Sequence, residues 1–207
     1  MKQIQHQSGA ALIVSLVLLG VISVLALSSA YSANTEMKVV ASQKERGVAF
    51  QAAEAALAQV EQQLATNPPP IEMLWSSCNG QGCFTPTCTG GLCFAGDFTS
   101  SDSEFDCRTV SVNPSAEHVP FWEDSVLNVW ESANRHREIE VTAVNATVKY
   151  IVEFMCYVRK DSMTPFDDTE ANKNNGVPLF RITAIASSNG NRAKVALQST
   201  FKLLGNI

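Results

Sequence analysis

GAALIVSLVLLGVISVLAL, residues 9–27, is the stretch of sequence that decides the fold of this chain. It contains no charged residue, and beyond the first residue only Ser15, Gly20 and Ser23 interrupt its aliphatic and alanine side chains. A helix of this length, rising about 1.5 Å per residue, crosses most of a bilayer core that is roughly 30 Å thick. The rest of the chain is therefore expected to be attached to a membrane helix.

The helical pattern continues beyond this run. Residues 28–66 contain no proline and one glycine, Gly47, and they are rich in alanine, glutamate, glutamine and lysine, which favour helices. The three prolines at 68–70 supply the first strong helix stop. The sequence therefore predicts one long helix over residues 10–65, apolar all round in its first half.

The second half of this helix is predicted to be amphipathic. Apolar residues recur at intervals of three and four, and charged residues avoid their row. The apolar row is Phe50, Ala53, Leu57, Val60 and Leu64, and the charged residues are Lys44, Glu45, Glu54 and Glu61. A coiled coil is the alternative, but fewer than three heptads with small alanines favour packing against a sheet.

An N-terminal apolar run is either a secretory signal that is removed after the run or an anchor that stays. Loose small-residue cleavage sites lie within residues 26–30, and Lys2 is the only fixed charge ahead of the run. Because the helical pattern does not stop at residue 30, retention of the apolar segment is favoured.

Composition excludes several classes of function. The chain has 207 residues, 45% of them hydrophobic, which suits one ordinary domain and one membrane segment. Its net charge is -5 and it has no cluster of lysine and arginine to follow a phosphate backbone, so nucleic acid is not an expected partner. No Ser/His/Asp grouping, phosphate loop or spaced carboxylate pair points to catalysis. A non-enzymatic protein without a cofactor is predicted.

All six cysteines follow the apolar run. They are Cys78, Cys83, Cys88, Cys93, Cys107 and Cys156. An even number beyond a membrane segment predicts disulfides in an oxidising compartment. Zinc is the alternative for the first four, but structural zinc sites favour close pairs joined by a longer spacer, so no metal site is predicted. Cys107 and Cys156 are candidates for a longer bridge, and the sequence leaves all fifteen pairings open.

The C-terminal third has a period of two, which is typical of strands. Residues 138–159 predict an antiparallel hairpin that turns at Asn145-Ala146, and residues 179–187 and 193–203 predict a second hairpin that turns within 188–191. Four antiparallel strands against an amphipathic helix make an α+β fold.

The region before these strands is harder to interpret. Residues 120–133 allow a short helix that carries Trp122 and Trp130. The two tryptophans form either a binding surface or a small core element, and the core element is favoured. His118 and His136 lie in no metal or nucleophile motif and are interpreted as surface or loop histidines.

An acidic stretch lies between the two hairpins. It contains Asp161, Asp167, Asp168 and Glu170. Oxygen ligands of this kind suit calcium, but they do not follow the twelve-residue calcium-loop pattern. A solvated loop over residues 161–170 is the favoured interpretation.

Three separated segments, in this order, resemble the type IV pilin superfamily and, within it, the PilX-type minor pilins. They are AALIVSLV at 10–17, RGVAFQAAEAAL at 46–57, and FRITA at 180–184 followed by VALQST at 195–200. Residues 68–138 carry no such resemblance. The resemblance implies a pilin fold, in which a long N-terminal helix packs on an antiparallel sheet.

The resemblance also implies how the chain is processed and divided. In this superfamily a prepilin peptidase cuts after a leader glycine, here Gly9, and the new N-terminus, here Ala10, is N-methylated. The implied parts are a leader at 1–9, a transmembrane and filament-core half-helix at 10–30, an amphipathic half-helix at 31–66, and an exported head domain at 67–207. Within the head domain lie a cysteine-rich loop at 75–107 and the hairpins at 138–207.

Val14 departs from the pattern of the major pilins, most of which carry a glutamate at this position, five residues past the cut. In the family that carboxylate is thought to pair with the N-terminal amine of a preceding subunit. A chain without the carboxylate loses this attraction to a predecessor, whereas its own amine at Ala10 still receives the next subunit. Such a chain is expected to begin a filament more easily than to extend one.

The resemblance implies a structural minor pilin that primes assembly of a type IV pilus, sits at or near its tip and supports twitching motility or adhesion. The implied partners are the other minor pilins, the major pilin, prepilin peptidase, the inner-membrane assembly platform and a tip adhesin. The implied location is the inner membrane, with a periplasmic C-terminal domain, and then the pilus. The alternatives are a type II secretion pseudopilus subunit and a membrane-anchored adhesive module.

Overall fold

The computed structural model describes residues 8–74, 78–94, 119–161, 176–188 and 193–204, and side chains from Ala11 onward. The chain forms two compact units, Met1–Lys44 and Glu45–Ile207.

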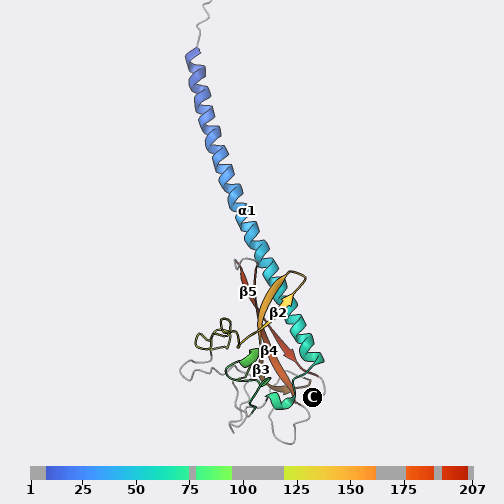
Figure 1. The fold of residues 1–207 in the computed structure, drawn as a ribbon. Helices are drawn as coiled ribbons and strands as arrows, with labels where there is room; N and C mark the ends of the chain where they lie inside the picture. Colours follow the sequence, from blue (N-terminus) through green and yellow to red (C-terminus); the bar gives the residue numbers. More distant parts are fainter. Residues whose placement is uncertain (1–7, 75–77, 95–118, 162–175, 189–192, 205–207) are drawn as a thin grey trace, which may run out of the picture. The chain divides into compact units, whose positions relative to one another are not determined.

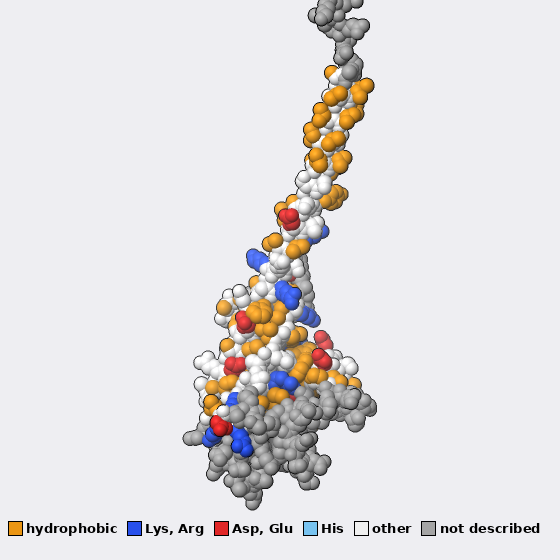
Figure 2. Space-filling model, turned by 180° about the vertical axis from the view of Figure 1, so that it is seen from behind, with side chains coloured by type: hydrophobic (Ala, Val, Ile, Leu, Met, Phe, Trp, Pro, Cys, Tyr) orange, Lys and Arg blue, Asp and Glu red, His pale blue; other side chains and the backbone are white. Residues whose placement is uncertain are grey.

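Helix α1 (Ser8–Thr66) is a single α-helix of 59 residues, as the sequence predicts (Figure 1). In the first unit its side chains from Ala11 to Lys44 are exposed, and Figure 2 shows hydrophobic side chains gathered over its upper turns. The helix is long and apolar enough to cross a membrane. Its last turn closes with a hydrogen bond from the Asn67 amide to the Gln63 carbonyl (2.8 Å), and the prolines then prevent continuation.

The second unit contains a mixed five-stranded sheet. Its strands are β1 (Leu92–Cys93), β2 (Arg137–Val141), β3 (Ala146–Arg159), β4 (Gly176–Ser187) and β5 (Lys194–Lys202). The order is β1-β3-β4-β5, and β2 pairs with the same edge of β3 at residues 146–150, before the residues that pair with β1. The predicted α+β fold and its two antiparallel hairpins are confirmed. The parallel strand β1 was not predicted, because two residues are too few to show a period.

The helix and the sheet enclose the main core of the second unit. Alanines dominate the buried side of the helix: Ala49, Ala52, Ala53 and Ala56 are all fully buried. They pack with one face of the sheet in a single hydrophobic cluster that includes Phe154 of β3. Small side chains allow a helix backbone to lie close to a sheet, so this face is built for close approach rather than for large apolar contacts.

Phe50 was predicted to belong to the buried row, and this prediction is wrong. Its side chain is 43% exposed, whereas Val60 is 2% exposed. At about 100° per residue, Phe50 lies on the edge of the stripe centred on Ala53. Leu57, also in the predicted row, is buried, and Leu64 is half-buried against the core.

An aromatic cluster fills the centre of the sheet beneath the helix. The Phe180 ring lies 5.7 Å from the Phe154 ring and 5.7 Å from the Phe84 ring, measured between centroids. The Phe94 ring lies 5.1 Å from that of Phe154. Phe84 and Phe94 come from the cysteine-rich stretch, so this stretch contributes to the main core rather than forming a separate appendage.

The cysteine-rich stretch was predicted as a loop, and its described parts contain short regular elements. The 3₁₀ helices η1 (Ile71–Leu74) and η2 (Thr89–Gly91) flank its first three cysteines, and η2 leads directly into β1. Gly91 has a φ of 74°, and a Cβ there would lie 2.9 Å from the Arg137 backbone nitrogen. Glycine is therefore required where this stretch meets β2.

The helix predicted over residues 120–133 is absent, and consecutive turns replace it. The Asp124 carboxylate accepts hydrogen bonds from the amides of Val126 (2.8 Å) and Leu127 (3.0 Å), and Asn128 has a left-handed φ of 44°. Such side-chain bonds compete with helical ones. Trp122 and Trp130 pack, partly buried, against a small cluster that includes Phe121, which supports the core-element interpretation.

His136 was interpreted as a surface or loop histidine, and this is wrong. It is 7% exposed, its Nδ1 donates a hydrogen bond to the Val129 carbonyl (2.7 Å), and its Nε2 lies 3.5 Å from the Glu138 carboxylate. Burial is possible because both ring nitrogens have a polar neighbour. His118 lies outside the described residues.

Candidate functional site

The predicted processing and assembly positions lie in the first unit. Gly9 and Ala10 are part of α1, so the predicted cleavage junction is in helical conformation. Val14 is 58% exposed on an apolar stretch of the same helix. All three positions lie in or next to the apolar segment. The polar groups described next all belong to the second unit.

The cysteine-rich stretch is held by two local disulfides. Cys78 pairs with Cys83 and Cys88 pairs with Cys93, with Cα atoms 5.7 Å and 4.1 Å apart. The predicted disulfides are thus present, and zinc is excluded for these four thiols because their sulfurs are bonded in pairs. Cys156 is also disulfide-bonded and lies buried in β3, whereas Cys107 lies outside the described residues.

The Cys88–Cys93 disulfide closes a small ring around η2 that is hydrogen-bonded to the start of β2 and to the chain before it. The Gly90 amide donates to the Asn134 carbonyl (2.7 Å), and Arg137 Nε donates to the Gly90 carbonyl (2.6 Å). Both cysteines are fully buried in the cluster that contains Phe121. The ring therefore joins η2 and β1 to the turns that carry the tryptophans.

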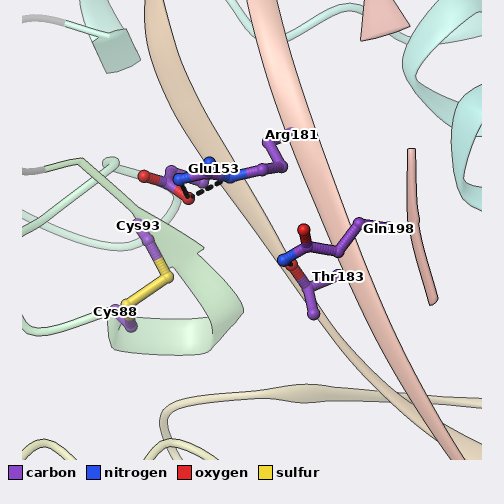
Figure 3. Close-up of polar contacts among 6 residues, drawn as sticks. All are labelled: Cys88, Cys93, Glu153, Arg181, Thr183 and Gln198. Carbon is purple, nitrogen blue, oxygen red and sulfur yellow. Dashed lines mark hydrogen bonds and ion pairs between the residues drawn. A yellow bond between two sulfur atoms is a disulfide. The ribbon is translucent and has the colours of Figure 1, made fainter. Parts of the chain in front are cut away.

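A buried ion pair lies beside this disulfide (Figure 3). Glu153 of β3 and Arg181 of β4 are directly opposite each other in the sheet. Arg181 donates from Nε (3.0 Å) and from Nη2 (2.7 Å) to Oε2 of Glu153. The Glu153 side chain is 4% exposed, and the guanidinium lies 4.3 Å above the centroid of the Trp122 ring. Two hydrogen bonds and an aromatic face compensate the charges for lost hydration.

The same face of the sheet carries a second polar contact. Gln198 of β5 donates from Nε2 to the Thr183 hydroxyl of β4 (3.0 Å), as Figure 3 shows. Thr183, like Arg181, alternates with the buried residues Phe180 and Ile182 that face the helix. Polar side chains therefore occupy the face of β4 that points away from α1.

The sequence interpretation did not single out Glu153 and Arg181. Their signal is a charged residue at an alternate position within an otherwise apolar strand, in YIVEFM and in LFRIT. Two such residues of opposite charge on pairing strands predict a cross-strand ion pair only when the register is known. The register depends on a bulge between Phe154 and Cys156, which the sequence does not reveal.

No group of three or more metal-ligating side chains occurs among the described residues. Of the acidic stretch, Asp161 is exposed, and Asp167, Asp168 and Glu170 lie outside the described residues, so the calcium alternative stays untested. Near the disulfides, Arg181 pairs with Glu153 and Gln198 donates to Thr183, so these polar side chains stabilise the pairing of the strands.

Replacing both Cys88 and Cys93 with serine is expected to lower the free energy of unfolding by about 2 kcal/mol. The disulfide stabilises the fold by reducing the conformational entropy of the unfolded chain, and this effect is modest for a ring as short as this one. Urea unfolding of the full chain in detergent micelles, followed by tryptophan fluorescence, measures the change. Replacing Ser125, which is exposed, with alanine is the control and should change stability by less than about 0.5 kcal/mol. An unchanged midpoint in the double variant would contradict the expectation.

Two models of known protein families together match residues 8–203 of the chain. Residues 8–58 match a family model described as PilX N-terminal, and residues 58–203 match one described as Type IV pilus assembly protein PilX C-term. The second match includes residues 68–138, where the sequence alone shows no resemblance. Searches of curated proteins and of solved structures found no match. Because the matched regions cover most of its length, the chain belongs to the PilX family of type IV pilus assembly proteins.

Proposed function

We propose that this protein is a minor pilin that primes pilus assembly and sits at or near the pilus tip. The observation that carries the proposal is a family match from residue 8 to residue 203 combined with Val14 at the place of the usual glutamate. A structural subunit needs no catalytic group, and the ion-paired, disulfide-linked second unit is consistent with that role. Its partners are other pilus components.

The proposed maturation follows the family pattern. Prepilin peptidase removes residues 1–9, and Ala10 becomes the methylated N-terminus. Residues 10–30 then span the inner membrane before assembly and line the filament core afterwards, since the same apolar side chains suit lipid or other helices. Residues 31–66 connect this segment to a periplasmic head at 67–207. The N-terminal sequence of the mature membrane form tests this division directly.

Val14 supports the tip position through the cost of burying charge. Its neighbours Leu12, Ile13, Leu16 and Val17 are all exposed apolar side chains, so a carboxylate at position 14 would enter an apolar medium. Such a group is tolerated when a cation pairs with it. A subunit with valine does not need a preceding subunit to supply that cation, and it can therefore stand first.

A deletion strain tests the function, and Val14→Glu tests the position. Without the protein, few or no surface pili are expected, and the wild-type chain should restore them. In the deletion strain, Val14→Glu is expected to place the protein along the pili instead of near their tips, because the new carboxylate can pair with a preceding subunit's amine. Immunogold labelling of sheared pili measures the distribution.

Val14→Leu is the matched control and should behave as the wild type does, because it adds no charge. Normal piliation of the deletion strain would overturn the proposed function, and an inert Val14→Glu would overturn the account of position 14 alone. Loss of protein secretion with intact twitching would instead assign the chain to a type II secretion pseudopilus. The interactions with a tip adhesin and with the assembly platform belong to the same proposal.

A further inference from the structure

A cavity of about 240 Å³ lies on the face of the sheet that points away from α1. Successive side chains of a strand point to opposite faces of the sheet. Val148 and Tyr150 of β3 pack with the helix alanines, so Lys149 between them points away from the helix. Neither the processing junction nor the disulfides contribute to the cavity.

Cross-strand neighbours form the floor. Glu138 of β2 is opposite Lys149 of β3, and Lys149 is opposite Ile185 of β4. Lys194 of β5 is opposite Ser187 of β4, the next position on this face of β4. The floor therefore presents an acidic side chain from β2, an apolar one from β4 and a basic one from β5.

Trp130 and Glu131 form the wall of the cavity, and two hydrogen bonds hold Trp130 in place. Lys149 donates from Nζ to the Trp130 carbonyl (2.7 Å), and Trp130 donates from Nε1 to the Trp122 carbonyl (3.0 Å). The ammonium of Lys149 is thus committed to holding the wall. A tethered wall beside a sheet gives a preformed pocket, which lowers the entropy cost of binding a small ligand.

The charges of the lining balance. The lining contains two carboxylates, of Glu131 and Glu138, and two ammonium groups, of Lys149 and Lys194. A phosphate would therefore be repelled by the two carboxylates, and a cation by the two ammonium groups. In the described part of the chain, the side chains of Glu131 and Lys194 make no hydrogen bond or ion pair. They remain available as one strong acceptor and one strong donor.

We propose that this cavity, bounded by Trp130, Glu131, Glu138, Ile185 and Lys194, binds the ring of a neutral sugar. A sugar ring carries hydroxyl groups that both donate and accept hydrogen bonds, which suits carboxylates at one end and an ammonium at the other. Its C–H faces suit Trp130 and Ile185. The small volume fits one ring at a time, and the balanced charge selects against ionic ligands. This site is additional to the assembly role.

Titration of the full chain in micelles of a detergent without a sugar headgroup tests the proposal. The probes are methyl galactoside, methyl N-acetylglucosaminide, N-acetylarginine amide and inorganic phosphate, and the readout is the ¹H–¹⁵N indole signals of the three tryptophans. At least one sugar is expected to shift the Trp130 signal, with a dissociation constant on the order of 1 mM. Because the ligand is neutral, this constant should change less than about twofold with added salt.

Glu131→Gln and Lys194→Met are each expected to weaken sugar binding by about fivefold, because each removes a charge-assisted hydrogen bond. Glu123→Gln and Lys160→Met, at exposed positions outside the cavity, are the matched controls and should leave binding unchanged. Unaltered signals of the other tryptophans confirm that each variant is folded.

The two sugars separate two sources of the ligand. Preference for the N-acetylated sugar indicates a glycan of the cell-wall type, and preference for galactose indicates a galactose-terminated surface glycan. The proposal is overturned if no sugar shifts Trp130 at saturating concentration, if the arginine derivative binds with strong salt dependence instead, or if the control variants weaken binding equally.

Discussion

Replacing Arg181 with methionine is expected to lower the free energy of unfolding by about 3 kcal/mol. The change leaves the Glu153 carboxylate, with its side chain 4% exposed, without its guanidinium partner. Removing the oppositely charged partner of a buried charge costs far more than the intact pair contributes. The contact of Arg181 with the Trp122 ring is lost as well. Urea unfolding of the full chain in detergent micelles measures the effect.

The double variant Glu153→Leu/Arg181→Met separates charge burial from packing. It removes both charges, so it should be more stable than Arg181→Met alone and close to the wild type. Arg159→Met, at the exposed end of β3, is the matched control and should change stability by less than about 0.5 kcal/mol. If the double variant is the least stable of the three, the pair itself is a large net source of stability and the expectation is wrong.

Replacing Phe180 with alanine is expected to lower the free energy of unfolding by about 4 kcal/mol. Its fully buried ring lies 5.7 Å from each of the Phe84 and Phe154 rings, so truncation leaves a cavity within the core. The rings around it come from separate strands and from the cysteine-rich stretch, so they cannot close the space without moving the backbone. Thermal unfolding followed by near-ultraviolet circular dichroism is the measurement.

Phe50→Ala is the control for that variant, because it removes the same ring from a position that is 43% exposed. It should cost less than about 1 kcal/mol. Equal losses for the two variants would show that Phe50 belongs to the core in solution. A small loss for Phe180→Ala would show that the cluster relaxes around the missing ring.

Local patterns were sufficient for the long helix and the two hairpins. The helix follows from the absence of proline up to the triplet at 68–70, and the strands follow from alternation and from the turn at Asn145, whose φ is 48°. Each of these signals lies within the element that it predicts. The residues carrying the family resemblance lie in the same elements, and therefore the PilX family was recognisable before the fold was known.

Features that depend on contacts between distant residues were not predictable. β1 is a strand because it lies beside Val152, and residues 120–133 form turns because Asp124 caps them and Phe121 enters a core with Cys88. His136 can be buried because the Val129 carbonyl accepts a hydrogen bond from its Nδ1. In each case a tertiary partner overrides the local preference.

The residues of the candidate site also fall into those that a local pattern predicts and those that depend on distant contacts. Val14 and the Gly9 junction are positions in a sequence pattern, so they could be predicted without a structure. The disulfide pairing was left open because even spacing fits several connectivities equally well. The Glu153–Arg181 pair required the strand register, which a bulge in β3 sets.

The pairing of β1 with β3 has a consequence for how the second unit folds during synthesis. β2–β3 and β4–β5 join neighbours in the sequence, whereas Leu92 must find Val152 across a long stretch of chain. Contacts at large sequence separation form late because their closure costs more entropy. The cysteine-rich stretch is made before β3, so β1 must wait for residues 146–159 before it can pair. Until then Phe84 and Phe94 lack the rings of Phe154 and Phe180, against which they pack in the folded unit.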